Sequence, residues 1–287
     1  MKYSVFTVML PEWTPEEAAP RLAAAGYEGV EWRVNLPPTK AIDSVPSAGR
    51  YWSANRCTID VNSLPGAAAS VREMTERAGL KLCALGTYTD ASDYAEVRKV
   101  MEASAIMGCP MLRIGPPRFG DGDDYNALFS KAVEDFGKVE AAAKEFGVKA
   151  TIEVHMNTIT SSPSLAHRLA SHFDPRYVGV ILDAGNMVFE GYENYSLALQ
   201  LLGPYLAHVH VKNYSWRKVG EKDGTAIWTA EPDTMWGGSA DYRRLLGLLK
   251  GIGYSGYLSF EDFNEALPTT EKLTRNIEYM RRLEASL

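Results

Sequence analysis

The sequence predicts a single (β/α)8 TIM barrel spanning residues 1–287, and three observations lead to it. Eight short runs rich in β-branched and aromatic residues alternate with eight helical segments, and strict alternation of this kind implies a parallel sheet. Eight such units are the number that closes a barrel. No repeat or linker divides the 287 residues, and 46% of them are hydrophobic, which is enough for one large core.

Each element has a local signal. Thr14-Pro15-Glu16-Glu17 combines an N-cap, a proline at the first helical position and acids at the positive helix end, and glycines such as Gly108 and Gly147 close helices. The expected strands are residues 4–8, 29–34, 82–88, 111–115, 150–155, 178–183, 207–211 and 256–262. The expected helices are residues 15–25, 67–78, 94–107, 125–146, 163–172, 195–202, 242–250 and 269–283.

Two connections, 35–65 after the second strand and 214–238 after the seventh, are longer than ordinary loops. They are expected to lie over the catalytic face. Their tryptophans, among them Trp52 and Trp228, indicate stacking on a sugar or an aromatic group, or burial at a subunit contact. An open doubly wound sheet is the alternative fold, but no G-x-G-x-x-G follows any expected strand.

Four expected strands, the fifth to the eighth, carry an acid or an imidazole at or near their C-terminal ends. These residues are named the strand-end set: Glu153, Asp183, His210 and Glu261. A polar group at the end of a buried strand is costly unless it has a partner or a task. Neighbouring barrel strands bring such ends together, and three oxygens with one nitrogen suit a hard divalent cation such as Mn²⁺ or Mg²⁺.

Each member also has a purely structural reading. Glu or Asp at a strand end often caps the next helix or pairs with a nearby Arg, and a lone His is more often structural than a ligand. His208 and His210 share one strand face, and His210 is the expected ligand because it lies nearer the C-terminal end. Four coincidences on successive strands favour the metal site.

The composition excludes several classes of protein. The net charge of −6 and an isoelectric point near 5.5 argue against a nucleic-acid surface, which needs a basic face. The three cysteines, Cys57, Cys83 and Cys109, are dispersed and odd in number, which favours a reducing compartment. The apolar run of residues 5–10 is too short for a signal peptide or a membrane span. A cytoplasmic protein is therefore expected.

The chain resembles the xylose isomerase-like barrels, the superfamily of sugar isomerases, epimerases and type 2 AP endonucleases. The matching motifs are Ile152-Glu153-Val154-His155, Leu182-Asp183-Ala184-Gly185-Asn186, His208-Val209-His210-Val211-Lys212 and Ser259-Phe260-Glu261. The resemblance covers essentially the whole chain. It implies one divalent cation on the strand-end set, Mn²⁺ first, with Mg²⁺, Co²⁺ or Zn²⁺ as alternatives, and a homo-oligomer.

By the same resemblance, Glu153 and Glu261 are both ligands and acid/base groups that move protons on opposite faces of a sugar, whereas Asp183 and His210 are ligands only. The chain departs from many relatives at one position. They have Asp-x-x-His where this chain has Asn186, and an amide does not titrate near neutral pH. Asn186 is therefore expected to bind substrate without transferring a proton.

Further candidates flank these motifs. His155 follows Glu153 on the same strand face and is a candidate general base. Lys212, Arg33, Trp52 and Arg217 are candidate substrate-binding residues. The sequence leaves the roles of two further residues undecided. Glu31 either pairs with Arg33 or leaves Arg33 to reach into the barrel mouth, and the role of Arg113 on the fourth strand is equally ambiguous.

The leading function is a metal-dependent isomerase or epimerase of a non-phosphorylated sugar or keto-sugar, working by proton abstraction α to a carbonyl and an enediolate. The alternative is a lyase on an oxidised (3-keto) glycoside, resembling the barrel subunit of C-glycoside deglycosidases, which implies a small β-rich partner subunit. A DNA-repair endonuclease is disfavoured by the acidic charge and five histidines. A non-catalytic sugar-binding barrel is the fourth reading. The sugar, the reaction outcome and the oligomeric state are not set by the sequence.

Overall fold

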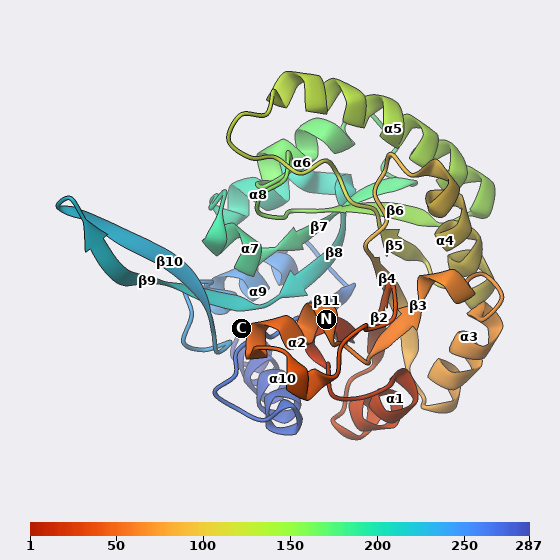
Figure 1. Ribbon diagram of the computed structural model, residues 1–287, viewed down its shortest axis with the longest axis horizontal. Helices are drawn as coiled ribbons and strands as arrows, with labels where there is room; N and C mark the ends of the chain where they lie inside the picture. Colours follow the sequence, from red (N-terminus) through yellow and green to blue (C-terminus); the bar gives the residue numbers. More distant parts are fainter.

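The computed structural model describes residues 1–287, and its centre is a closed barrel of eight parallel strands (Figure 1). Around the barrel these are β1 (Lys2–Phe6), β2 (Gly29–Asn35), β4 (Lys81–Thr87), β5 (Met111–Arg113), β6 (Lys149–Glu153), β7 (Val178–Asp183), β8 (Leu206–Val211) and β11 (Tyr257–Phe260). β1 pairs with both β2 and β11, which closes the sheet. The predicted fold class is confirmed.

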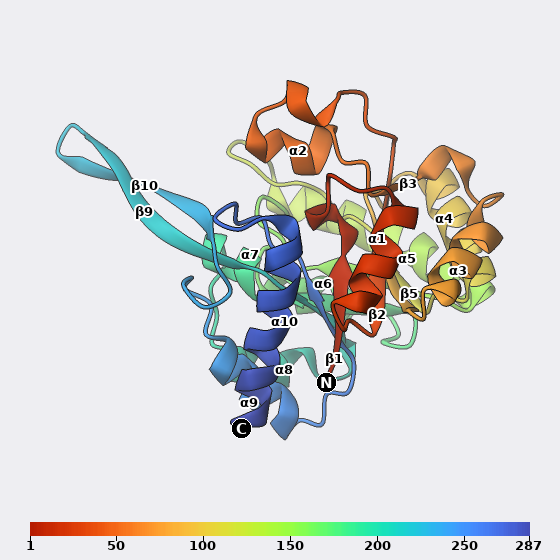
Figure 2. The same cartoon turned by 90° about the horizontal axis from the view of Figure 1, so that it is seen from below.

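Eight helices surround the barrel and alternate with its strands (Figures 1 and 2). Thr14 and Glu17 form a reciprocal capping box at the first helix, and Gly108 and Gly147 end two others with φ of 68° and 67°. The eight are α1 (Pro15–Ala24), α3 (Ala68–Arg77), α4 (Tyr94–Met107), α5 (Tyr125–Phe146), α6 (Pro163–Ala170), α8 (Tyr195–Leu202), α9 (Tyr242–Gly251) and α10 (Thr269–Ala285).

The hydrophobic core is continuous from the barrel strands to the inner faces of these helices. All six residues of β7 are buried, as expected for a strand covered on both faces. The three cysteines are buried and free, so the structure contains no disulfide. No helix combines the length and the apolar character that crossing a membrane requires.

The two long connections are more ordered than the sequence suggested. Residues 35–65 contain two 3₁₀ turns, the helix α2 (Ser47–Ser53) and the strand β3 (Thr58–Asp60). β3 pairs with the last residues of β2 and lengthens that edge of the barrel. A further short helix, α7 (Ala184–Phe189), follows β7 directly and was not predicted.

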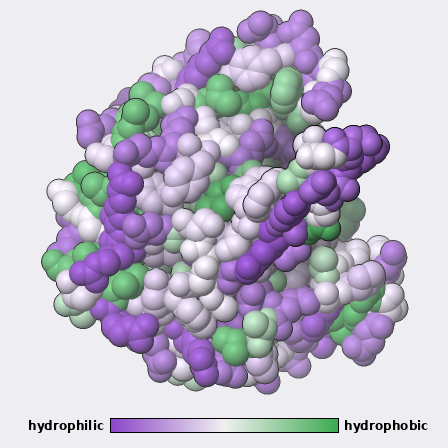
Figure 3. Space-filling view, turned by 90° about the vertical axis from the view of Figure 1, so that its left-hand side faces the viewer, coloured by the Kyte–Doolittle hydropathy of each residue, from purple (hydrophilic) through white to green (hydrophobic).

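The expectation of a polar loop at residues 214–238 was wrong for most of its length. β9 (Asn213–Lys222) and β10 (Thr225–Asp233) form an antiparallel hairpin that projects from the barrel (Figures 1 and 2). Asp223 and Gly224 both have positive φ, 51° and 78°, as a two-residue hairpin turn of the I′ type requires. Figure 3 faces this side of the molecule, where hydrophilic and hydrophobic residues are interspersed.

Candidate metal centre

The strand-end set comes together at the C-terminal mouth of the barrel. Glu153 and Asp183 end β6 and β7, His210 lies in β8, and Glu261 directly follows β11. One ligand atom from each of the four lies within 4.8 Å of the others, and none of the four residues is more than 3% exposed. His210 Nδ1 is 3.1 Å from Glu153 Oε1, 3.6 Å from Asp183 Oδ2 and 3.9 Å from Glu261 Oε2.

Asp183 caps a helix and also faces the set. Its Oδ1 accepts the backbone N–H of Asn186 at 2.8 Å and so starts α7. Its Oδ2 has no hydrogen-bond partner, although Lys212 Nζ lies 3.0 Å away. The structural reading of a strand-end acid and the ligand reading therefore both apply to Asp183, one to each oxygen.

Glu153 is fixed from two sides. Arg113 forms an ion pair with its Oε2, and Arg113 Nε donates to the carbonyl of Thr87 at 3.0 Å. The Asn186 side-chain amide donates to Glu153 Oε1 at 3.1 Å and to the carbonyl of Val154 at 3.0 Å. Asn186 thus orients a predicted ligand from behind, and it is fully buried where the sequence had led us to expect a substrate contact.

The acids of the set differ in pKa. Burial acts to raise the pKa of Glu153, but Arg113 and His210 outweigh it and hold that pKa well below its usual range. Burial raises the pKa of Glu261 to about 7 despite the Lys212 ammonium, with the charge of Glu153 acting in the same direction. Burial opposes charging of His210, but neighbouring carboxylates, Glu31 foremost, raise its pKa well above the usual value.

These residues suit a divalent cation. Three carboxylates and one imidazole form the donor set, and an Asp183 oxygen in it lacks a hydrogen bond. Together with Glu31, four buried carboxylates meet here, and the only Lys or Arg side chains that pair with them are Arg113 and Lys212. Four carboxylates against two such side chains leave two negative charges, and in the metal-free protein the raised pKa values of His210 and Glu261 show protons taking that place. A divalent cation would supply the same charge.

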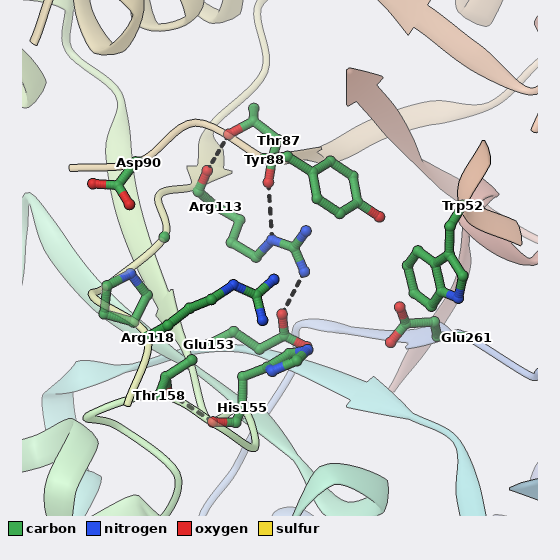
Figure 4. Close-up of a pocket in the computed structure, with 12 residues that line it drawn as sticks. Trp52, Thr87, Tyr88, Asp90, Arg113, Arg118, Glu153, His155, Thr158 and Glu261 are labelled. Atoms are coloured by element: carbon green, nitrogen blue, oxygen red, sulfur yellow. Dashed lines mark hydrogen bonds and ion pairs between the residues drawn. The ribbon is translucent and has the colours of Figure 1, made fainter. Parts of the chain in front are cut away.

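A pocket of about 160 Å³ opens beside the set (Figure 4). Glu153 and Glu261 form part of its wall, and Trp52 lies across from His155. Its other lining residues include Tyr88, Asp90, Arg113, Arg118 and Thr158.

Only some of the other predicted site residues reach the pocket or the strand-end set. His155 and Trp52 line the pocket, and Lys212 contacts Glu261 and Asp183 within the set. Arg33 does not line the pocket: its guanidinium donates to Thr58 and to the Trp52 carbonyl. Arg217 lies on the hairpin, 58% exposed, and pairs with Asp233 at 3.1 Å, so the structure does not bring it to the pocket.

Sequence reasoning missed Arg118 and left Glu31 undecided. Arg118 lines the pocket and makes no ion pair, and its place in the loop after β5 was the available signal, because such loops build the mouth of a barrel. Glu31 is fully buried and pairs with His208 and His210 instead of Arg33. Its neighbours come from β8, which no local sequence pattern indicates.

A family model described as xylose isomerase-like TIM barrel matches residues 20–283. The chain belongs to this family. It is 28% identical to an inosose dehydratase of Clostridium perfringens (strain 13 / Type A) over 141 residues, which cover 45% of each protein, so the match spans less than half the length of that relative. The resemblance inferred from the four motifs is thus confirmed at family level.

Two solved structures illustrate the likeness in fold. The 3-keto-D-glucoside 4-epimerase from E. coli has a TM-score of 0.73 at 16% identity, covering 98% of this chain and 99% of that one. A xylose isomerase-like TIM barrel protein from Mycobacterium smegmatis, in complex with magnesium, has a TM-score of 0.71 at 16% identity, covering 99% and 97%. At such identities the similarity concerns the fold alone.

Proposed function

We propose that the chain is a divalent-metal-dependent isomerase or epimerase of a non-phosphorylated sugar or keto-sugar. The observation that carries this proposal is the strand-end set beside a pocket whose wall includes His155. Membership of the family, the epimerase fold of one relative and the magnesium bound by another agree with it.

His155 has the properties of a general base. Its Nδ1 lies 2.8 Å from the carbonyl oxygen of Met156, and a carbonyl only accepts, so Nδ1 carries the proton and Nε2 keeps the lone pair. Burial, the largest effect, lowers the pKa of His155, so the imidazole is neutral near pH 7. A neutral imidazole lining the pocket can take a proton from a carbon next to a carbonyl.

A divalent cation held by Glu153, Asp183, His210 and Glu261 would polarise the substrate carbonyl as a Lewis acid. Glu261, a carboxylate once the cation has displaced its proton, lies on the pocket wall where it could exchange a proton with the substrate. Arg118, which has no acidic partner, is free to donate hydrogen bonds to substrate hydroxyl groups. Return of the proton to the neighbouring carbon gives isomerisation, and return to the same carbon from the other face gives epimerisation.

The test is exchange of substrate protons with solvent. Metal-loaded protein is incubated with candidate keto-sugars in D₂O, and deuterium at carbon is followed by NMR. The proposal expects uptake α to the carbonyl by the wild type and a loss of at least 100-fold in His155→Gln, within the usual contribution of a general base. No uptake into any keto-sugar that binds would leave a non-catalytic sugar-binding barrel as the better account.

A second candidate is a lyase on a 3-keto glycoside, and one observation favours it. Trp52 separates the pocket from a neighbouring groove of about 550 Å³, lined mostly by apolar and aromatic side chains. The groove lies between α2, the base of the hairpin and the segment after β11, and includes Tyr51, Tyr214, Pro232 and Phe263. It provides room for an apolar aglycone beside a sugar ring.

The partial similarity to an inosose dehydratase also agrees with elimination chemistry. A 3-keto glycoside with an aromatic aglycone discriminates between the two candidates. Release of the free aglycone supports the lyase, whereas deuterium exchange without release supports the isomerase or epimerase. The lyase also predicts a small β-rich partner subunit, which co-purification with the natively expressed chain would detect.

A further inference from the structure

Glu31 is a buried carboxylate that contacts no lysine or arginine. It lies in β2 with no solvent exposure, and its partners are two histidines of β8. His208 Nε2 is 3.1 Å from Glu31 Oε2, and His210 Nε2 is 3.0 Å from the same oxygen and 3.2 Å from Oε1. Burying a charge is costly unless the charge is paired and hydrogen-bonded, and the two histidines provide the only such partners here.

The His210 ring has two different sides. Nε2 faces Glu31, whereas Nδ1 faces the three carboxylates of the strand-end set, the nearest being Glu153 Oε1 at 3.1 Å. The ring also stacks on Phe6, with centroids 5.6 Å apart and planes inclined by 29°. Phe6 limits tilting of the ring, so Nε2 stays toward Glu31 and Nδ1 toward the strand-end set.

We infer that Glu31 is a positioning residue that holds the proton of His210 on Nε2 and thereby presents Nδ1 to a divalent cation. This inference rests on the metal site of the proposed function. A carboxylate behind a metal-binding histidine fixes its tautomer and raises its basicity as a ligand. His208, donating to the same Glu31 oxygen, keeps that carboxylate in place.

A competing arrangement uses the same residues. Glu31, His208 and His210 also have ligand atoms within 4.8 Å of one another, so they resemble a second cation site. Both sites together would require both nitrogens of the His210 ring, which a neutral imidazole cannot supply because one nitrogen carries a proton. The geometry therefore predicts one cation per chain, bound through Nδ1.

The first measurement uses the wild-type protein alone. Metal-free protein labelled with ¹⁵N-histidine is titrated with ¹¹³Cd²⁺, and the coupled ring nitrogens are observed by NMR. The inference expects one Cd²⁺ per chain, coupling to Nδ1 of His210 and a protonated Nε2. Coupling to Nε2, or two cations per chain with His208 as a ligand, would overturn it.

The second measurement compares variants by calorimetric titration with Mn²⁺. Glu31→Gln is expected to bind Mn²⁺ 10- to 100-fold more weakly than wild type, the usual effect of losing a carboxylate behind a metal-binding histidine. Asp135→Asn is the matched control, because Asp135 is a buried carboxylate on α5 that pairs with Lys131 and Lys138 and does not belong to either ligand group. It is expected to bind Mn²⁺ with wild-type affinity.

Equal affinities in Glu31→Gln and wild type would refute the inference and leave the metal site intact. A wild-type protein that binds neither Cd²⁺ nor Mn²⁺ would instead refute the metal site itself, so the two failures are distinguishable. If Glu31→Gln does not fold, the NMR measurement on the wild type still decides the question.

Discussion

Adding Mn²⁺ to the metal-free protein should release protons, and the number should depend on pH. Two of the four predicted ligands hold protons that a cation must displace. Burial, assisted by the charge of Glu153, gives Glu261 a pKa of about 7, and the surrounding carboxylates raise the pKa of His210 well above its usual value. Glu153 is ionised throughout, because Arg113 holds its pKa low against burial.

The expected number follows from these values. A carboxyl group with a pKa of about 7 is about 90% protonated at pH 6 and about 10% protonated at pH 8. His210, whose pKa is raised well above its usual value, adds to the protons released, since the metal displaces the proton of Nδ1. The share from Glu261 should therefore fall by nearly one proton per Mn²⁺ between pH 6 and pH 8.

The sign of the pH effect follows as well. An acid with a raised pKa is protonated below that pKa, so protons compete with the cation as the pH falls through 7. Mn²⁺ affinity should accordingly rise with pH, and more steeply below pH 7 than above it. Calorimetry in two buffers of different ionisation enthalpy measures the released protons directly.

Glu261→Gln is the control, because its amide does not titrate. In this variant the difference between pH 6 and pH 8 should disappear, while the proton from His210 remains. Binding with no proton release at either pH would show that the cation does not use these two groups and would refute the reasoning.

Three substitutions test how the site is held. Arg113→Met should lower the free energy of unfolding by about 3–5 kcal/mol because it leaves the buried Glu153 carboxylate without its cationic partner. Arg118→Met, which breaks no ion pair, should change the free energy of unfolding by no more than about 0.5 kcal/mol. Urea unfolding measures both. Asn186→Ala removes two buried hydrogen bonds, so we expect about 1–3 kcal/mol less stability and weaker Mn²⁺ binding by calorimetry; unchanged binding would contradict its orienting role. Gly185→Ala would bring a Cβ within 2.6 Å of the Lys212 carbonyl, and a melting temperature equal to wild type would contradict the expected cost of about 1–3 kcal/mol.

The fold could be predicted from the sequence because its signals are local. Most barrel helices have their own cap, such as the Thr14 capping box or the left-handed Gly108, and the alternation of elements determines the topology. The hairpin was missed although its turn, Asp223-Gly224, is a typical hairpin signal. Charged residues along both strands obscured the alternation, since the projecting hairpin is solvated on most of its surface.

In the candidate site, too, the residues placed by local signals and topology could be predicted, and those placed by contacts between strands could not. The strand-end set could be predicted because a polar residue at the end of each barrel strand is placed by topology alone. Glu31 and Arg113 could not, since their partners are on other strands and strand register decides which side chains meet. Arg217 is expected from the sequence in a loop over the mouth because the hairpin was not predicted, but the hairpin places it outward, paired with Asp233.

The central claim is that Glu153, Asp183, His210 and Glu261 hold one divalent cation. Elemental analysis of protein purified without chelator tests it most directly, with Glu261→Gln prepared in parallel. The account predicts about one Mn, Mg, Co or Zn per wild-type chain and a clear loss in the variant. A wild-type protein without metal, indistinguishable from the variant and unable to take up added Mn²⁺, would contradict it.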